Sequence, residues 1–376
     1  MFLKEECNNN YKEDKMIIDN NEIPNNNSNY NNFQNIIKRV NKDDISSLEK
    51  LKQLLLDNKN KLLEIFEIKE FLDSGSESLV YKVLNKNTQK PFVLKFIFNK
   101  YDRKRNINEF NILNKLKNIN IISSYGITEI LKGELDCVIM EYGKLGNIKS
   151  FMRNKLKRDY LSESLLCYFT CQILNGLIYC HKCNICHFDI KPQNIIIDEF
   201  LNAKIIDFSI SLDYQKIKTN KIQLTFRGTN AYMAPEVIIT KIIDKNNLNK
   251  IDLYSLGVTL YFLAFGKFPY DIIKEDTKYI NIIYNKIQNN KLEFYKEEKY
   301  YSLVFIDFLQ KILEKDINKR INIYEAFNHP WIKGGNILLE EKEKISNISN
   351  FLIYLMTNHF FNFIDYLKEE EKKFTE

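Results

Sequence analysis

Hydrophobic and polar positions change their spacing repeatedly along this chain. Before residue 33, asparagines predominate and apolar residues are few, so burial cannot offset the entropy lost on ordering. From Ser46 onward, leucines recur at helical intervals, and Ser46 with Glu49 has the spacing of a capping box. The pattern predicts an Asn-rich disordered tail over 1–32 and a helical extension over 33–66, whose helix runs roughly from residue 44.

The middle of the chain has the pattern of a small sheet followed by helices. Between Ile68 and Phe98 the spacing of apolar residues drops toward two. Short β-branched and aromatic runs lie on either side of 73–78 and 85–90, which predicts three antiparallel strands. After about residue 160 the period becomes helical. The long apolar-periodic segments are 161–183, 252–265, 301–313 and 321–329. The predicted fold class is therefore α+β.

The last segment of the chain alternates charged stretches with apolar residues such as Phe351, Leu355 and Phe363. This pattern predicts a C-terminal helical extension over 334–376. One interpretation is an amphipathic appendage that docks on the main domain. The alternative is a helix that binds a regulatory partner, and the same alternative holds for the extension over 33–66.

Composition limits the classes of function. With 376 residues and 44% hydrophobic content, the chain can form a large two-lobed domain plus extensions. The net charge of +6 comes from 55 basic and 49 acidic residues of mixed distribution, so we expect no nucleic-acid partner. No long apolar run or signal peptide is evident, which predicts an intracellular, cytoplasmic protein without a transmembrane segment. Seven cysteines, an odd number, do not suggest a disulfide framework.

The strongest chemical signal is the sequence His187-Phe-Asp-Ile-Lys-Pro-Gln-Asn194, followed by Asp207-Phe-Ser209. A carboxylate near a nucleophile, together with oxygen ligands for Mg²⁺, is what phosphoryl transfer requires. These two motifs resemble the catalytic-loop and metal-binding signatures of the eukaryotic-type serine/threonine protein kinase family. The resemblance implies a bilobal fold, with a sheet-containing N-lobe over 67–140 and a helical C-lobe over 145–333.

The resemblance extends in both directions and in the family's order. The further matching segments are Pro91–Lys95, Glu109, Val138–Gly143, Gly228–Glu236, Asp252–Gly257, Asp316–Arg320 and His329–Trp331. Together they cover about residues 67–333, the predicted kinase domain. By resemblance, Arg320 is the buried partner of Glu236.

The resemblance also implies the roles of the catalytic residues. Asp189 accepts or orients the proton of the substrate hydroxyl, and Thr229 hydrogen-bonds close to it. Lys191, which is typical of serine/threonine members, neutralises charge on the transferring phosphate. Asn194 and Asp207 hold Mg²⁺, and Mg²⁺ and ATP are the expected cofactors, with proteins as substrates.

For ATP, the resemblance implies that Lys95 contacts the α- and β-phosphates and is held by an ion pair with Glu109. Met140 takes the gatekeeper position at the hinge, and ATP is expected between the lobes. The expected ATP-binding residues are Asp73, Ser74, Gly75, Ser76, Glu77, Ser78, Val80, Val93, Lys95, Glu109, Met140, Glu141, Tyr142, Gly143 and Ile196.

Three positions depart from the family pattern. The loop before Val80 keeps only Gly75 of three glycines, and Ser209 replaces the last residue of the metal motif, which narrows the backbone freedom there. Phe188 replaces the catalytic-loop arginine that normally pairs with a phosphorylated activation segment. Thr225 stands where many relatives are phosphorylated, and without that arginine we expect activity not to depend strongly on its phosphorylation.

Two alternatives remain open at this point. Because of these departures, the chain could be a pseudokinase that keeps the fold and acts as a scaffold or an allosteric binding protein. The cysteines and histidines over 180–187 have C-x₂-C-x₂-C-H spacing, which is also compatible with a zinc site. In the kinase interpretation the same segment is the end of a buried helix and the turn into the catalytic loop.

Overall fold

The computed structural model describes residues 61–74, 78–98, 103–130, 135–215, 217–223, 228–239, 242–294, 301–345, 347–356 and 361–375. The predicted tail over 1–32 and residues 33–60 lie outside these ranges. Helix α3 (Leu62–Ile65) lies within the stretch where the N-terminal helical extension was predicted. Contacts divide the described residues into two units, one lying within 61–117 and 122–142 and the other within 118–121 and 143–375.

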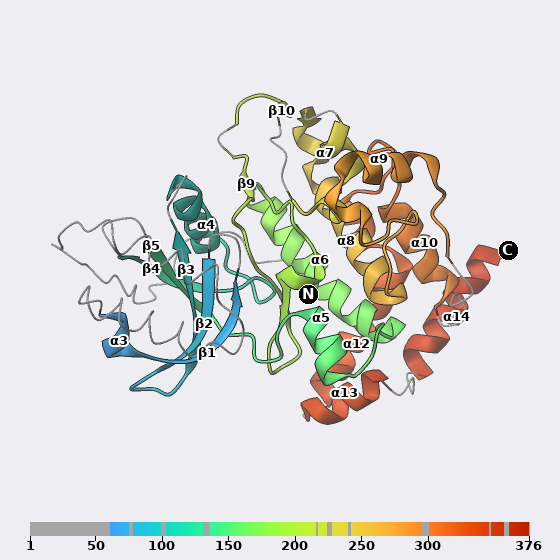
Figure 1. Ribbon diagram of the computed structural model, residues 1–376. Helices are drawn as coiled ribbons and strands as arrows, with labels where there is room; N and C mark the ends of the chain where they lie inside the picture. The colour runs from blue at the N-terminus through green and yellow to red at the C-terminus, as the bar shows by residue number, and fades with distance from the viewer. Residues whose placement is uncertain are drawn as a thin grey trace. The chain divides into compact units, whose positions relative to one another are not determined.

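The N-terminal unit is built on one antiparallel sheet (Figure 1). Its strands are β1 (Phe66–Ser74), β2 (Ser78–Asn85), β3 (Pro91–Phe98), β4 (Ser124–Ile130) and β5 (Leu135–Glu141). They lie in the order β1-β2-β3-β5-β4, and the three strands predicted before residue 99 are confirmed. Helix α4 (Arg103–Lys115) contacts β4 and completes the unit.

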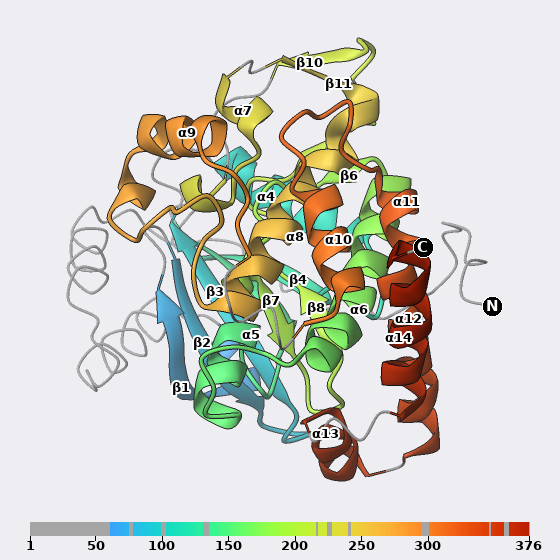
Figure 2. The same cartoon turned by 90° about the vertical axis from the view of Figure 1, so that its right-hand side faces the viewer.

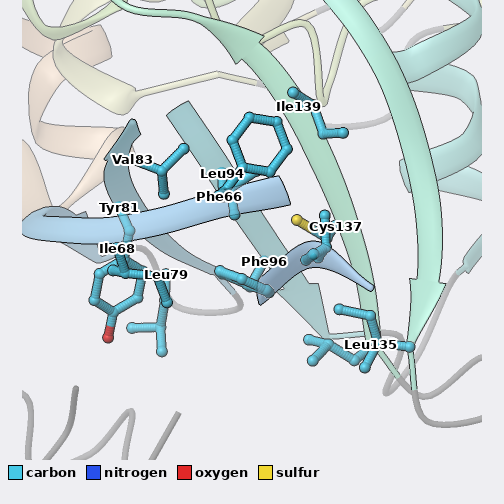
Figure 3. Close-up of a cluster of buried hydrophobic side chains, with 12 residues drawn as sticks. Phe66, Ile68, Leu79, Tyr81, Val83, Leu94, Phe96, Leu135, Cys137 and Ile139 are labelled. Atoms are coloured by element: carbon cyan, nitrogen blue, oxygen red, sulfur yellow. The ribbon is translucent and has the colours of Figure 1, made fainter. Parts of the chain in front are cut away.

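Alternation along the strands explains why this sheet forms. Leu79, Tyr81 and Val83 of β2 are buried, while the residues between them keep partial exposure (Figure 3). The Tyr81 ring packs edge-on against Phe71 and Phe96, at centroid separations of 5.5 and 6.1 Å. A period of two gives the sheet one apolar face, and burial of that face holds the strands in register.

The second unit is mainly helical, as the pattern predicted. Its principal helices are α5 (Ile148–Ser150), α6 (Glu163–Lys182), α7 (Pro235–Ile239), α8 (Leu248–Phe265), α9 (Ile280–Asn289), α10 (Leu303–Ile312) and α11 (Ile323–Phe327). Helix α8 begins four residues before the predicted start at Asp252, because Leu248 and Ile251 are buried as well.

Within the described residues, three short two-stranded sheets flank loops of this unit. They pair β6 (Ile185–Cys186) with β9 (Leu212–Asp213), β7 (Ile195–Ile197) with β8 (Ala203–Ile205), and β10 (Lys221–Gln223) with β11 (Ile242–Asp244). The β7–β8 hairpin lies directly between the two sequence motifs that carry the candidate metal ligands.

The C-terminal segment forms three helices, α12 (Pro330–Lys344), α13 (Ile348–Met356) and α14 (Phe361–Thr375). Helices α12 and α13 contact α6, and α14 contacts α12 (Figure 2). The contact of α12 with α6 is close, because Gly335 lies against the sulfur atoms of Cys167 and Cys171 with no room for a side chain. The predicted extension from residue 334 thus shares a helix with the residues before it.

Glu163, the first residue of α6, joins three parts of this unit. Its carboxylate accepts hydrogen bonds from Ser302 N at 2.7 Å and from the Trp331 indole at 2.9 Å, as well as from the Ser302 hydroxyl. Although the residue as a whole keeps some exposure, its carboxylate is enclosed by these groups. Burial, with a smaller contribution from the nearby Glu371, raises the pKa of Glu163 to about 7, against the effect of the hydrogen bonds.

This raised pKa predicts a pH-dependent stability. Because folded Glu163 holds its proton more tightly than the unfolded residue, the stability from this group is present at low pH and is lost as pH rises toward 7. We expect the free energy of unfolding to fall by about 3 kcal/mol between pH 4.5 and 7. Glu163→Gln should remove this component in urea denaturation followed by circular dichroism. An unchanged pH slope in Glu163→Gln, with Glu340→Gln as the exposed control, would contradict the assignment.

Candidate active site

The catalytic loop over 187–194 is anchored by a buried carboxylate of α8. Asp252 accepts hydrogen bonds from the backbone N–H groups of His187 at 2.9 Å and Phe188 at 2.8 Å. The His181 imidazole lies 2.9 Å from the same carboxylate. Burial opposes ionisation of Asp252, but these neighbours outweigh it and lower its pKa. The anchor was missed as a site residue in the sequence, where only its motif was recognised.

The Asp189 carboxylate is the centre of a polar cluster. Oδ1 accepts from the backbone N–H of Thr229 at 3.0 Å and from its hydroxyl at 2.7 Å. Oδ2 accepts from the Lys191 amine at 2.6 Å and from the Asn194 amide at 2.9 Å. The Lys191 amine also donates to the Thr229 hydroxyl at 2.7 Å. The structure therefore brings together all four residues predicted to be catalytic.

His187 connects this cluster to the second motif. Its Nδ1 accepts from the backbone N–H of Asp189 at 3.1 Å, so Nε2 carries the proton and donates to the carbonyl of Ile206 at 3.0 Å. The buried ring packs on Phe208 at a centroid separation of 4.7 Å. His187 thus connects two loops and has a structural role.

Asn194 and Asp207 flank the two strands of the β7–β8 hairpin. The hairpin is closed at this end by a hydrogen bond from Ile206 N to Asn194 O at 2.9 Å. The Asn194 amide nitrogen donates to Asp189, which leaves its Oδ1 as the atom for a cation. Asp207 has a left-handed backbone with φ +66°, a conformation that Asp tolerates better than most residues. A carboxylate and an amide oxygen are suitable ligands for Mg²⁺.

In the N-terminal unit, Lys95 and Glu109 form the predicted ion pair. The amine of Lys95 on β3 lies 2.9 and 3.1 Å from the two carboxylate oxygens of Glu109 on α4. Glu109 is buried and Lys95 is mostly buried. The pair therefore fixes the position of a cation on the sheet, where anionic phosphate could bind it.

The other residues predicted to bind ATP fall into two groups. In the N-terminal unit, Val80 lies opposite Lys95 in the sheet and Val93 lies opposite Met140, while Ser74 N donates to Asp73 Oδ1. Ser78, Glu141 and Tyr142 lie at the ends of strands, with the Lys82 amine over the Tyr142 ring. In the second unit, Gly143 packs directly on Ile196. Gly75, Ser76 and Glu77 lie outside the described residues.

The departures from the family pattern also have structural correlates. Phe188 is buried and has a left-handed backbone with φ +67°. Because its side chain is apolar, it offers no positive charge to a phosphate. Gly228 has φ +105°, and a side-chain carbon there would lie 2.6 Å from the Phe188 carbonyl oxygen, so glycine is required. Ser209 is not among the described residues with positive φ. A serine therefore replaces the glycine of the family pattern there without the strain of a left-handed backbone. Thr225 lies outside the described residues.

The structure does not support the zinc alternative at 180–187. Cys180 and Cys186 are buried, and burial raises the pKa of both thiols. Nowhere in the described ranges do three or more His, Cys, Asp or Glu side chains cluster as a metal site.

Among the helices of these same ranges, none has the length and apolar character needed to cross a membrane.

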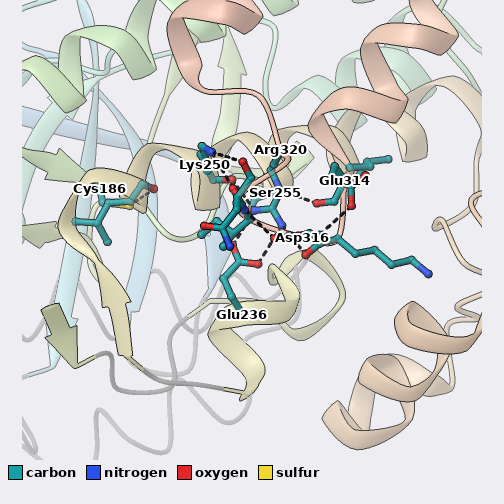
Figure 4. A network of polar contacts seen from close by, with 12 residues as sticks. Cys186, Glu236, Lys250, Ser255, Glu314, Asp316 and Arg320 are labelled. Atoms are coloured by element: carbon teal, nitrogen blue, oxygen red, sulfur yellow. Dashed lines mark hydrogen bonds and ion pairs between the residues drawn. The ribbon is translucent and has the colours of Figure 1, made fainter.

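The predicted partner of Glu236 is confirmed as Arg320 (Figure 4). The two guanidinium nitrogens of Arg320 donate to the two carboxylate oxygens of Glu236 at 2.7 and 3.0 Å. Arg320 also donates to the carbonyls of Glu314 and Lys250, and its guanidinium lies 4.7 Å from the Tyr254 ring centroid. The pair ties α7 to α8 and to the loop after α10.

Comparisons with known proteins agree with this geometry. The protein kinase domain family model matches residues 66–332. Serine/threonine-protein kinase pakE of Dictyostelium discoideum is 31% identical over 76% of this chain and 29% of its own length, and pakH of the same organism is 33% identical over 71% and 50%. The chain thus spans half or less of these two relatives.

Myosin light chain kinase A of Dictyostelium discoideum is 32% identical to this chain over 73% of the chain and 90% of its own length. The family match includes the sheet with its Lys95–Glu109 pair, the Asp189 cluster and the Glu236–Arg320 pair. On this match and these relatives, the chain belongs to the protein kinase family.

Proposed function

We propose that this protein is an active serine/threonine protein kinase that transfers the γ-phosphate of Mg-ATP to protein hydroxyls. The observation that carries the proposal is the Asp189 cluster, in which Lys191, Asn194 and Thr229 all donate to one carboxylate. A cluster held in this way is preorganised, so little energy is needed to orient it during the reaction. The relatives, named as serine/threonine kinases, support the same substrate class.

In the proposed reaction, the substrate hydroxyl oxygen attacks the γ-phosphorus and the bond to the bridging oxygen breaks, which releases ADP. The hydroxyl proton passes to Asp189, whose carboxylate orients the nucleophile. Lys191, held 2.6 Å from Asp189, places a positive charge next to the transferring phosphate. Thr229 keeps both side chains in position through its hydroxyl.

Asn194 and Asp207 are the proposed ligands of Mg²⁺. Bound Mg²⁺ would neutralise negative charge on the phosphates. The short β7–β8 ladder pairs the residues next to Asn194 with those before Asp207 and so holds the two ligands near each other in space. His187 connects this end of the hairpin to Asp189. Lys95, fixed by Glu109, is the proposed contact of the α- and β-phosphates.

The test compares nucleotide binding with phosphate transfer. Wild-type protein should show Mg-ATP-dependent thermal stabilisation and should transfer radiolabelled phosphate to a generic serine-containing acceptor. Asp207→Ala should abolish the transfer, because it removes a metal ligand. Gln215 is exposed and offers a control, since Gln215→Ala should leave the transfer unchanged.

The pseudokinase alternative makes a different prediction in the same experiment. Stabilisation by Mg-ATP without any transfer would contradict the catalytic proposal and would favour a scaffold. Transfer that survives in Asp207→Ala would mean that a contaminating kinase is responsible, and it would also count against the proposal.

A further inference from the structure

Three cationic side chains gather on the second unit, outside the residues assigned above. Lys149 lies in α5, and Arg153 follows one turn later in the adjoining helical turn η2 (Phe151–Lys155). Burial lowers the pKa of Lys149, and the charges of Arg153 and Lys274 lower it further, so both charges lie close to its amine. Lys274 comes from the loop after α8, far away in the sequence, so the fold brings these residues together. Lys149, Arg153 and Lys274 form the cation cluster.

The cation cluster contains no carboxylate that balances its charge. Within the described part of the chain, none of its members forms an ion pair. Of the acids that follow Lys274, Glu275 is exposed and Asp276 binds the amine of Lys286 at 2.6 Å. The two helical members lie on one face, where like charges destabilise a helix. The cluster therefore costs stability in the protein alone, whereas a bound anion would offset the repulsion.

A row of aromatic rings leads from the cation cluster toward the catalytic loop. The Lys149 amine lies 5.2 Å from the centroid of the Phe262 ring on α8, and Phe262 packs on Phe268 at a centroid separation of 5.2 Å. Phe268 in turn packs edge-on against Tyr232 at 5.5 Å. The Phe262 ring attracts the charge of Lys149 and so fixes where its amine lies. The row therefore connects the cation cluster to Tyr232 through direct contacts.

Tyr232 lies close to the catalytic carboxylate. It ends the turn η4 (Asn230–Tyr232), which directly follows Thr229. Thr229 binds Asp189 through its backbone N–H and its hydroxyl. Burial raises the pKa of Tyr232, and the charge of Asp189 raises it further, so the phenol lies within reach of that charge. The aromatic row thus ends at the site where the substrate hydroxyl is proposed to react.

Lys274 has a second connection to the same turn. Its carbonyl accepts from the Thr277 hydroxyl at 2.7 Å, and the Thr277 carbonyl accepts from the Asn230 amide at 3.1 Å. Asn230 directly follows Thr229 in the chain. The loop that carries Lys274 is therefore held to the segment that binds Asp189, and the two sites keep a fixed relation.

The length of the aromatic row sets the spacing that a substrate needs. Its steps between the Tyr232 ring and the Lys149 amine measure 5.2, 5.2 and 5.5 Å. An extended peptide advances about 3.3 Å per residue, so a segment of about five residues covers this span. A substrate with its hydroxyl at Asp189 therefore brings a side chain within about five residues to the cation cluster.

We propose that Lys149, Arg153 and Lys274 determine substrate specificity by binding an acidic side chain within about five residues of the hydroxyl that is phosphorylated. The substrate class is then a protein segment with aspartate or glutamate close to the acceptor serine or threonine. This inference rests on the proposed function, because it places the acceptor hydroxyl at Asp189. It names the kind of sequence that the proposed kinase prefers.

The first test measures binding of fluorescein-labelled peptides to the full-length protein by fluorescence polarisation. Each peptide carries one serine in a neutral background, with either aspartate or asparagine at a single position within about five residues of the serine. At the best position, the aspartate peptide should bind about tenfold more tightly than its asparagine counterpart. The difference should shrink at high salt, because ions screen exposed charges.

Three variants locate this preference in the protein. Lys149→Met keeps a stem that packs on Phe262 and removes the charge, so it should lower the preference to about twofold or less. Lys149→Glu should reverse the preference, so that lysine at the same peptide position binds more tightly than aspartate. Lys155→Met is the matched control at an exposed lysine. Because Lys155 is neither three nor four residues from Lys149 or Arg153, this variant should keep the wild-type preference.

Phosphate transfer to the same peptides separates this inference from the proposed function. In the wild type, kcat/KM should be about tenfold higher for the best aspartate peptide than for its asparagine counterpart. If no peptide were phosphorylated, the proposed function would fail, while an aspartate preference in binding that Lys149→Met removes would still support the cation cluster. Equal affinities for aspartate and asparagine peptides at every position, or a preference that Lys149→Met retains, would overturn the inference.

Discussion

Asp189→Asn is expected to lower kcat by about 100-fold or more. The substitution removes the negative charge and one acceptor, and its new amide group would face donors such as Lys191 and Thr229. The base for the substrate hydroxyl is lost at the same time. Because Asp189 is not among the proposed ATP ligands, KM for ATP should change little. The measurement is steady-state transfer to an unbiased peptide library, which also reports the accepted residues.

A matched control separates chemistry from folding. Asp271→Asn makes the same change at an exposed position of the same unit and should retain wild-type kcat. Both variants should unfold at the temperature of the wild type within a few degrees. If Asp189→Asn kept more than about a tenth of the wild-type kcat, the role of Asp189 in proton transfer would be wrong.

The second large effect concerns stability. Arg320→Leu should lower the free energy of unfolding by about 3–5 kcal/mol, because it leaves the buried Glu236 carboxylate without its charge partner. It also removes the donors to the carbonyls of Glu314 and Lys250. Urea denaturation, followed by fluorescence of Trp331, the only tryptophan, measures the change.

Two further variants make this prediction specific. Arg153→Leu, at an exposed arginine of the same unit, should change the free energy of unfolding by less than about 0.5 kcal/mol. Arg320→Lys should recover only part of the loss, since an ammonium cannot donate to both oxygens of Glu236 in the same planar geometry. A loss below about 1 kcal/mol in Arg320→Leu would show that the pair is not a major support of the fold.

Much of the active site could be predicted from the sequence because its parts are local. Asp189, Lys191 and Asn194 lie within six residues, so one loop conformation brings them together. Lys95 and Glu109 are separated by a strand, a connection and a helix in the order that the family shares. The alternation of β2 and the helical period of α6 likewise predicted the elements on which these residues stand.

Other contacts could not be predicted, because they join residues far apart with no periodic signal. Lys342 and Asn202 are separated by 140 residues, and Glu163 and Trp331 by 168. Asp252 appeared in the sequence only as part of a motif, and its anchoring of the catalytic loop required the packing of α8 on β6. The start of α8 was placed too late because Asn249 and Lys250, which keep partial exposure, interrupt the run of apolar residues before Asp252.

The packing of α12 against α6 has one more consequence. The sulfur atoms of Cys167 and Cys171 lie under α12, where they donate to the carbonyls of Trp331 and Ile332 at 3.0 and 3.3 Å. Both side chains are buried, so an alkylating reagent cannot reach either sulfur atom while α12 is in place, and burial also raises the pKa of the Cys167 thiol. The rate at which these two thiols are alkylated therefore measures how often α12 separates from α6 through local opening.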